Sequence, residues 1–217
     1  MIIHDFSKQN SILNQFIFEL RDVETQKDAM RFRKNIERIG EILCYELSKT
    51  LEYKSTIVQT PFGSKKMALP QNKLVLCSVL RAGLTLHQGL LNYFDTAENA
   101  FISAYRHHLK NSNAFEVIVK YLAAPKLNNK TLVLTDPMLA TGKTLENVRK
   151  ALKAHGEPKQ IHIMSVIGSK AGVDYVSHIF PESTHLWIAT IDDVLNEKGY
   201  IIPGLGDAGD LAFGLKL

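Results

Sequence analysis

Hydrophobic residues along the chain fall into two patterns, apolar runs that fit buried strands and helical spacings that fit amphipathic helices. Residues 20–50 carry dense charge with isoleucine and leucine at helical spacing, which predicts an amphipathic helix or helix pair. Further along, the pattern predicts strands at residues 73–79, 100–105, 132–134, 161–167 and 185–190, and helices at residues 84–93, 145–152 and 170–179. This alternation indicates an α/β fold, a mostly parallel sheet flanked by helices on both faces.

The alternation stops between residues 105 and 125. Lys110-Asn-Ser-Asn113 is a turn signal between two apolar runs, and it predicts a β-arm or hairpin over residues 101–121. Such an arm often covers a site or meets a partner subunit. Residues 199–214 are rich in glycine and aspartate, and composition alone predicts a loop there.

Composition narrows the class of protein only slightly. The 217 residues, 45% of them hydrophobic, suffice for one domain with a full core, and no linker or repeat divides residues 1–217. A net charge of +4 without a dense basic run suits an anionic small molecule as well as a nucleic acid. Aromatic residues are not interleaved with basic ones, as a nucleic-acid surface would require.

Cysteine usage and the apolar runs predict a cytoplasmic protein. Cys44 and Cys77 lie in apolar surroundings without metal-ligand spacing, which favours reduced thiols. The first residues lack the basic and apolar regions of a signal peptide, and no apolar run is long enough to cross a bilayer. We therefore expect no membrane partner.

One segment concentrates the chemistry, Thr131-Leu-Val-Leu-Thr-Asp-Pro-Met-Leu-Ala-Thr-Gly-Lys-Thr144. It predicts a buried strand, an acid, a loop of small residues and then the start of a helix. Unpaired backbone N–H groups converge at such a start, and the helix dipole adds roughly half a positive charge. The sequence therefore predicts an anion site, with phosphate as its occupant.

Two other interpretations of this loop stay open. Gly142-Lys-Thr144 fits the end of a nucleotide-triphosphatase P-loop, but that motif needs a glycine where Pro137 stands. Proline has no N–H to donate and a fixed φ, so the P-loop is disfavoured. The acid before the loop, Asp136, instead fits a carboxylate beside the hydroxyls of a phosphorylated sugar. The simplest alternative is an ordinary strand-to-helix turn capped by Thr141 or Thr144.

Two further segments are candidates for ligand binding. Ser78-Val-Leu-Arg-Ala-Gly83 follows a predicted strand, where Arg81 could clamp a pyrophosphate, although a lone arginine is more often a surface residue. In residues 200–210, glycines let the backbone approach a flat heterocycle, with Asp207 beside it; a functionless terminus is the alternative. Adjacent His107 and His108 would point to opposite faces of a strand, so they cannot bind one metal together.

Together these segments resemble the uracil phosphoribosyltransferase family. The family's loop for phosphoribosyl pyrophosphate (PRPP), Asp-Pro-Met-Leu-Ala-Thr-Gly-Gly-Ser, is similar to Asp136-Pro-Met-Leu-Ala-Thr-Gly-Lys-Thr144. Residues 80–83 match its Leu-Arg-Ala-Gly loop, and Tyr105-Arg106 match the pair that opens its β-arm. Residues 200–210 match its uracil-binding tail, Tyr-Ile-x-Pro-Gly-Leu-Gly-Asp-Ala-Gly-Asp, so the similarity covers most of the chain.

The resemblance implies a type I phosphoribosyltransferase fold with a protruding β-arm and a C-terminal base-binding hood. It implies the salvage reaction of uracil with PRPP to UMP and pyrophosphate, with Asp136, Arg106 and Asp207 as catalytic residues. Implied PRPP contacts are Arg81, Arg106, Asp136, Pro137, Met138, Leu139, Ala140, Thr141, Gly142, Lys143, Thr144 and Asp207. Implied uracil contacts are Tyr200, Ile201, Gly206, Asp207 and Ala208. Mg²⁺ would be bound mainly through PRPP, without a dedicated protein site.

The resemblance also implies a homodimer or higher homo-oligomer, joined partly through the arm at residues 101–121. GTP is a candidate allosteric activator, and the sequence does not decide whether it regulates the enzyme. Three departures from the family pattern bear on regulation, arm geometry and affinity: Lys143-Thr144 replace Gly-Ser, Leu211 replaces an arginine, and His107-His108 replace acids. Tolerance for other pyrimidine bases is not fixed by these motifs. Two alternative functions stay open, a P-loop-type nucleoside kinase and a non-catalytic pyrimidine-responsive regulator.

Overall fold

The protein is described by a computed structural model that covers residues 1–108 and 115–216, and the side chains of residues 104–119 lie outside the described set. In the described part, eight strands form one sheet in the order β1-β10-β9-β7-β4-β5-β6, with β8 paired to β9. These strands are Ile2–Asp5 (β1), Leu74–Leu80 (β4), Glu98–His108 (β5), Phe115–Ala123 (β6), Thr131–Thr135 (β7), Met138–Leu139 (β8), Gln160–Ser169 (β9) and His185–Asp192 (β10).

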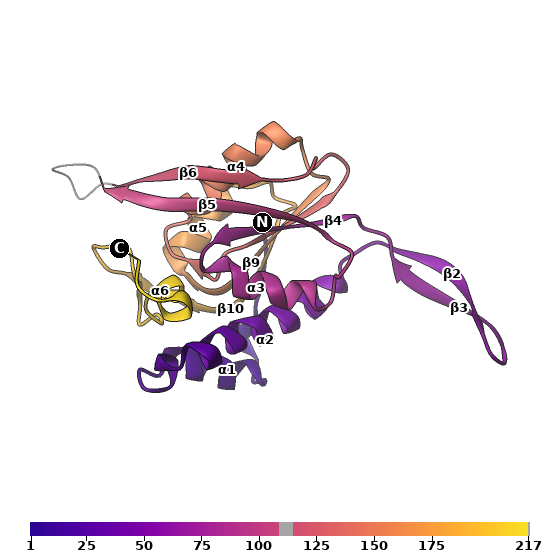
Figure 1. Cartoon of the computed structure of the whole chain (residues 1–217), viewed down its shortest axis with the longest axis horizontal. Coiled ribbons are helices and arrows are strands. Elements are labelled where there is room, and N and C mark those ends of the chain that lie inside the picture. Colours follow the sequence, from indigo (N-terminus) through magenta and orange to yellow (C-terminus); the bar gives the residue numbers. More distant parts are fainter. Residues whose placement is uncertain (109–114, 217) are drawn as a thin grey trace.

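All neighbouring strands of this sheet are parallel except β5 and β6, which are antiparallel (Figure 1). Two small antiparallel pairs lie outside it, Tyr53–Thr60 (β2) with Gly63–Pro70 (β3), and Val194–Leu195 (β11) with Ile201–Ile202 (β12). The strands β4, β7 and β9 are almost continuously buried and carry mostly apolar residues at their centres, as expected of parallel strands covered on both faces.

Helices cover both faces of the sheet, and the sheet therefore separates the core into two clusters (Figure 1). Leu13–Arg21 (α1), Ala29–Ser48 (α2), Gly83–Leu91 (α3) and Ala208–Phe213 (α6) pack on one face, and Lys143–Leu152 (α4) and Lys170–Ile179 (α5) on the other. The buried stripe of α2, which includes Phe32, Ile36, Ile39 and Leu43, has the spacing of an amphipathic helix. Short 3₁₀ turns occupy Phe6–Lys8, Thr25–Lys27 and Lys153–His155.

The predicted α/β fold is confirmed, and each predicted strand and helix exists with ends shifted by a few residues. The predicted hairpin over residues 101–121 is confirmed for its described residues, as the pair β5 and β6. The turn signal Lys110-Asn-Ser-Asn113 lies outside the described residues. The C-terminal stretch, expected to be a loop, also contains β12 and α6.

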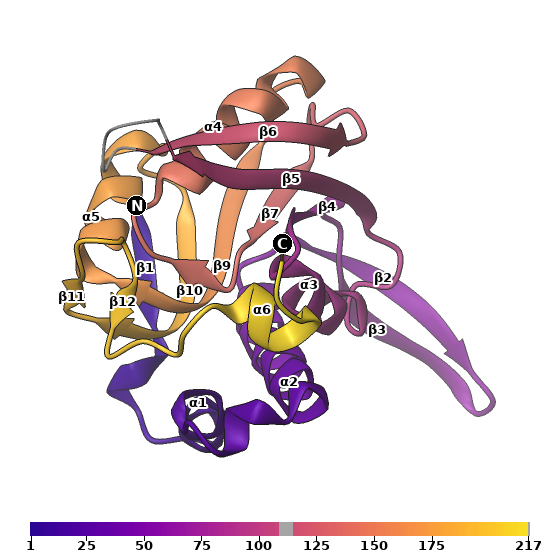
Figure 2. The same cartoon turned by 60° about the vertical axis from the view of Figure 1, so that its left-hand side comes forward.

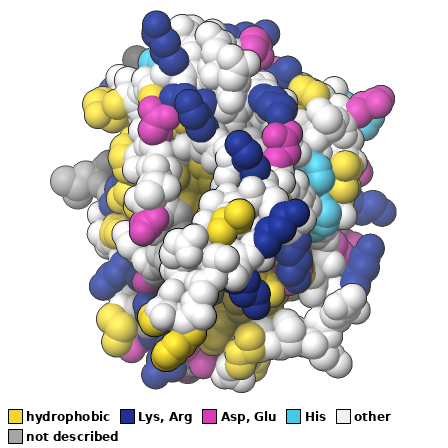
Figure 3. All heavy atoms as spheres, turned by 90° about the vertical axis from the view of Figure 1, so that its right-hand side faces the viewer, with side chains coloured by type: hydrophobic (Ala, Val, Ile, Leu, Met, Phe, Trp, Pro, Cys, Tyr) yellow, Lys and Arg dark blue, Asp and Glu magenta, His cyan; other side chains and the backbone are white. Residues whose placement is uncertain are grey.

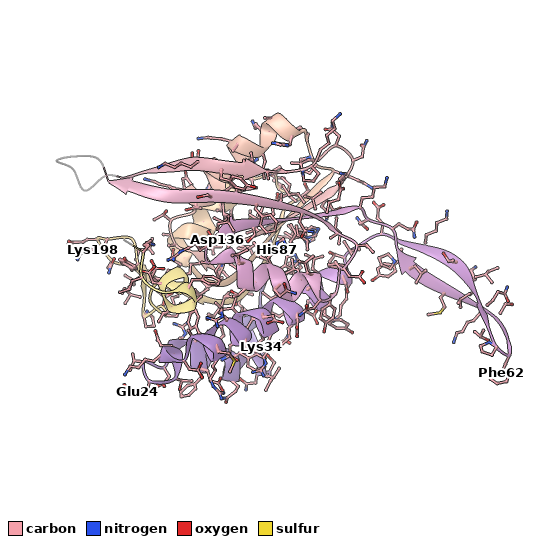
Figure 4. All side chains as sticks on the ribbon, viewed as in Figure 1. Glu24, Lys34, Phe62, His87, Asp136 and Lys198 are labelled. Carbon is pink, nitrogen blue, oxygen red and sulfur yellow. The ribbon has the colours of Figure 1, made fainter. Side chains whose placement is uncertain are left out.

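A second hairpin, β2 and β3, projects from the body and was not predicted (Figure 1). Every residue of both strands is exposed, and Phe62 at the tip is fully exposed (Figure 4). Hydrophobic side chains are exposed beside basic ones on the side from which this hairpin extends (Figure 3). The sequence signal was weak because neither face of the hairpin is buried, so no apolar alternation marks it.

No helix in residues 1–108 and 115–216 is long and apolar enough to span a membrane.

Candidate active site

Two loops meet where the strand order of the sheet reverses. The chain leaves β4 toward β5 on one side and returns to β7 on the other, so the loops after β4 and β7 flank a crevice at their carboxyl ends. Open α/β sheets bind ligands at this position. Arg81 follows β4 and Asp136 follows β7, so the fold brings two predicted site residues to neighbouring strand ends. Figure 4 shows Asp136 in the middle of the molecule, near the start of α3.

Gly83 allows α3 to begin close against these strand ends. A Cβ atom at Gly83 would lie 2.7 Å from Ser78 Oγ and 2.8 Å from the Thr135 carbonyl oxygen, which is too close for any side chain. The glycine of the Leu-Arg-Ala-Gly motif therefore has a packing role. It keeps the Arg81 loop next to the end of β7.

Asp136 is held by its backbone and is only 9% exposed. Its N–H donates to the Met164 carbonyl at 3.2 Å, and its carbonyl accepts from Ser165 Oγ at 2.6 Å. The carboxylate Oδ1 accepts from the Met138 N–H at 3.2 Å. The two backbone contacts to β9 and the Met138 contact fix the position of the carboxylate at the end of β7.

The loop after Asp136 forms a small hollow lined by Asp136, Met138, Leu139, Ala140, Thr141, Gly142, Thr144 and Leu145. In the described chain, the backbone N–H groups of Thr141, Gly142 and Thr144 form no hydrogen bond. Gly142 is the N-cap of α4 with a φ of +76°, a conformation that favours glycine. Unpaired donors at a helix N-terminus favour the binding of an anion, which is the chemistry that the sequence predicts for this loop.

The structure argues against an ordinary turn capped by a threonine. Gly142 occupies the N-cap position, and no side-chain hydrogen bond caps α4. Thr141 Oγ1 instead accepts from the Lys143 N–H at 3.5 Å, the limit of a hydrogen bond. The N–H groups of Thr141, Gly142 and Thr144 are therefore available to a ligand.

The start of α5 supports the phosphate loop from behind. Ser169 donates from Oγ to the Ala140 carbonyl at 2.6 Å, and its Oγ accepts from the Gly172 N–H at 2.9 Å. Because the C=O and N–H of a trans peptide point in opposite directions, this bond turns the Thr141 N–H away from Ser169. A Cβ at Gly172 would lie 2.1 Å from the Ala140 oxygen, so only glycine permits this approach.

The C-terminal segment closes over both loops (Figure 2). The Ala208 N–H donates to Met138 Sδ at 3.4 Å, and Arg81 Nη2 lies 2.8 Å from Asp210 Oδ1. Asp207 caps α6 through a bond from the Asp210 N–H to its Oδ1 at 3.1 Å. Residues 70 and 129 positions apart in sequence therefore meet at one site.

Charge is arranged so that Asp207 is ionised at neutral pH. Burial raises the pKa of its carboxyl, but the backbone N–H groups of Asp210 and Gly209 and the Lys216 ammonium outweigh burial. The pKa is therefore lowered from its ordinary value. Lys216 Nζ lies 3.3 Å from Asp207 Oδ2.

The C-terminal segment is anchored by an arginine–aspartate ion pair that the sequence did not predict. Arg21 on α1 binds both oxygens of Asp192 at 2.7 and 2.8 Å, and Asp192 accepts from the Gly204 N–H at 2.9 Å. Arg21 also donates to the Gly204 carbonyl at 3.0 Å. Since Arg21 and Asp192 are 171 residues apart, no local pattern could reveal the pair. Ser169, also missed, carried one signal: a serine before a predicted helix is a typical cap.

The remaining predicted residues differ in how they can contribute. The side chains of Leu139, Ile201 and Ala208 are buried, so only their backbone can face a ligand. Both backbone groups of Tyr200 are bonded to Asn196, and its side chain is 43% exposed. The Pro137 carbonyl accepts from the N–H groups of Val166 and Ile167. The backbones of Arg106, His107 and His108 lie in β5, but their side chains are outside the described residues.

A mostly parallel sheet with an acidic residue and a glycine-capped helix start after the strand at its switch point is the architecture of a type I phosphoribosyltransferase. Comparisons with known proteins identify the family within this class. The model of the family described as uracil phosphoribosyltransferase matches residues 7–215. The chain belongs to this family of pentosyl-transferring enzymes.

Individual relatives agree with this assignment. A uracil phosphoribosyltransferase of Porphyromonas gingivalis is 50% identical, with 100% of this chain and 99% of the relative covered. One of Thermococcus gammatolerans is 36% identical, with 97% and 92% covered. Among solved structures, the AQ2163 protein from Aquifex aeolicus has a TM-score of 0.87 at 28% identity, with both chains covered in full. Neither the P-loop kinase nor the regulator alternative gains support from these matches.

Proposed function

We propose that this chain joins uracil to PRPP, forming UMP and releasing pyrophosphate, in pyrimidine salvage. The observation that carries the proposal is the meeting of three segments: the unpaired N–H groups of Thr141, Gly142 and Thr144, the carboxylate of Asp136, and the C-terminal residues 206–210. These provide, in order, for a phosphate, a ribose and a base. The family's reaction needs all three at one place.

The PRPP side of the site is assigned by its charges. The 5-phosphate binds the N–H groups of Thr141, Gly142 and Thr144, and Asp136 faces the ribose hydroxyls. Arg81 and Arg106 bind the pyrophosphate, since an arginine fork matches two phosphate oxygens. Positive charge develops on the ribose ring and negative charge on pyrophosphate as the bond breaks, so Asp136 and the arginines stabilise the transition state electrostatically.

The uracil side is assigned to the backbone around Gly206, which has a φ of +91°. Among the described residues, the Ala208 N–H is bonded only to the Met138 thioether, a weak acceptor that a uracil carbonyl would replace. Cytosine carries a donor at its 4-position, where uracil has an acceptor. A mismatch would leave buried polar groups unpaired, at roughly 1–3 kcal/mol each.

Mg²⁺ fits this site as a companion of PRPP. Among the side chains that the structure describes, those of residues 1–103 and 120–216, no group of three or more His, Cys, Asp or Glu could hold a metal by itself. The carboxylates of Asp136 and Asp207 are hard oxygen ligands of the kind that Mg²⁺ uses together with substrate phosphates. When bound, the ion would neutralise charge on the pyrophosphate.

One assay tests the proposed function. Uracil, PRPP and Mg²⁺ are incubated with the protein, and UMP and pyrophosphate are measured by chromatography. We expect the two products in equal amounts. ATP consumption without pyrophosphate would support a kinase instead, and RNA binding without UMP would support a regulator. The same assay with GTP added tests activation, and with cytosine it tests base tolerance.

Cytoplasmic location stays a prediction, consistent with the buried unpaired Cys44 and Cys77.

We also propose a homodimer in which the β2–β3 hairpin contacts the second copy, in addition to the arm at residues 101–121. Ile57, Phe62 and Met67 are exposed by 67%, 101% and 47%, and an isolated two-stranded hairpin is marginally stable in water. Replacing Phe62 and Met67 by aspartate should raise the dimer dissociation constant at least about tenfold. Light scattering over a dilution series measures this, and an unchanged mass profile would contradict the role of the hairpin.

A further inference from the structure

Arg81, which the proposed function assigns to pyrophosphate, is already bonded to the C-terminal segment. Its Nη2 donates to Asp210 Oδ1 at 2.8 Å and to the Gly214 carbonyl at 3.1 Å. Within the described residues these are its hydrogen-bond partners, so the Nε and Nη1 donors have none. The guanidinium therefore has one side held by protein and one side available to a ligand.

Asp210 is built into the helix that carries the proposed uracil site. It lies in the first turn of α6, and its backbone N–H bonds the cap residue Asp207. The helix lies close to the Arg81 loop, because a Cβ at Gly209 would be 3.9 Å from Ala82 Cβ and from Arg81 Nη2. Asp210 is thus the charged link between the loop after β4 and the segment that closes over the base.

Lys216 completes an alternating row of charges at this surface. Its ammonium lies 3.3 Å from Asp207 and 3.9 Å from Asp210, so the order is Arg81, Asp210, Lys216, Asp207. The Lys216 contacts are weaker than the Arg81 contact, since this lysine side chain is 65% exposed. The Arg81–Asp210 pair, with side-chain exposures of 40% and 20%, is the least exposed ion pair of the row and therefore its strongest.

We propose that Asp210 is a positioning residue for Arg81. Its carboxylate fixes one edge of the guanidinium so that the other edge faces the pyrophosphate. Because the same residue belongs to α6, binding of PRPP also favours the closed position of the uracil-binding segment. This inference rests on the proposed function, and it extends it by coupling the two substrate sites through one ion pair.

A positioning role and a competing role of Asp210 predict opposite changes in PRPP binding, and the test distinguishes them. If Asp210 merely competed with pyrophosphate for Arg81, its removal would strengthen PRPP binding. A positioning role requires weaker binding, because the long arginine side chain must then be ordered by the ligand itself.

The test compares Asp210→Asn with Asp210→Glu and with the matched control Lys216→Met, which removes a charge from the same row. We expect Asp210→Asn to raise the KM for PRPP about tenfold with kcat changed less than threefold, in line with the loss of a charge-assisted bond. Asp210→Glu should recover part of the affinity, and Lys216→Met should change KM less than threefold. Calorimetric titration with PRPP and Mg²⁺ should show the same order of affinities.

Coupling is measured by the affinity for uracil with and without pyrophosphate and Mg²⁺, and we expect the difference to shrink in Asp210→Asn. An unchanged or lower KM for PRPP in a folded Asp210→Asn variant would overturn the inference. So would an equal effect of Lys216→Met. A wild-type protein that makes no UMP would instead overturn the proposed function, which separates the two failures.

Discussion

Replacing Asp136 by asparagine will lower kcat/KM about 10²–10³-fold, the range measured when one preorganised electrostatic group is removed from an active site. The asparagine can still accept the bond from the Met138 N–H, so the loop should keep its shape. What disappears is the negative charge beside a ribose ring that becomes positive. The loss should therefore fall on the chemical step as well as on PRPP binding.

Steady-state kinetics with uracil and PRPP measure this, with thermal unfolding as a check of the fold. Asp174→Asn is the matched control, because Asp174 is an exposed acid on α5 and its replacement removes the same charge outside the site. A folded Asp136→Asn variant with kcat/KM close to wild type would exclude Asp136 from the proposed role.

Replacing Gly172 by alanine should damage the phosphate site without touching a ligand. The added Cβ would lie 2.1 Å from the Ala140 oxygen and 2.8 Å from the Leu139 oxygen, and both are backbone atoms. The phosphate loop must then move away from α5 by on the order of 1 Å, a misplacement that typically costs about 10²-fold in rate. Overpacking of this kind also lowers the free energy of unfolding by about 1–3 kcal/mol.

The measurement is kcat/KM for PRPP together with the free energy of unfolding in urea. Ala171→Ser serves as control, since Ala171 is an exposed neighbour on the same turn of α5. If Gly172→Ala lost stability but bound PRPP as tightly as wild type, the loop at residues 139–144 would not be the phosphate site.

The sequence predicted the local elements of the candidate site, because these elements depend on short segments. Strand, acid, small-residue loop and helix follow one another in residues 131–152, and their order is enough to predict an anion site. Pro137 disfavoured the P-loop on covalent grounds alone, since it has no N–H. The resemblance then added the roles of Arg106 and Asp207, which no local pattern assigns and which stay predictions.

The sequence predicted the sheet well for a similar reason. Strands buried on both faces carry runs of apolar residues at their centres, and amphipathic helices repeat their apolar residues at helical spacing. The edge strand β1 and the β2–β3 hairpin escaped prediction because they have little buried surface. Where burial does not constrain a strand, its sequence carries little of the pattern that reveals it.

What the sequence determined by itself was therefore the buried strands, the helices that cover them and the candidate phosphate loop, because each depends on residues a few positions apart. Only the tertiary structure decided which distant groups meet: Ser169 and Gly172 behind the loop, Arg21 with Asp192 under the C-terminal segment, and Arg81 with Asp210 above it. These contacts join residues as far apart as 171 positions and follow from the order of strands in the sheet. That order arises from packing of the whole chain, which no short segment encodes.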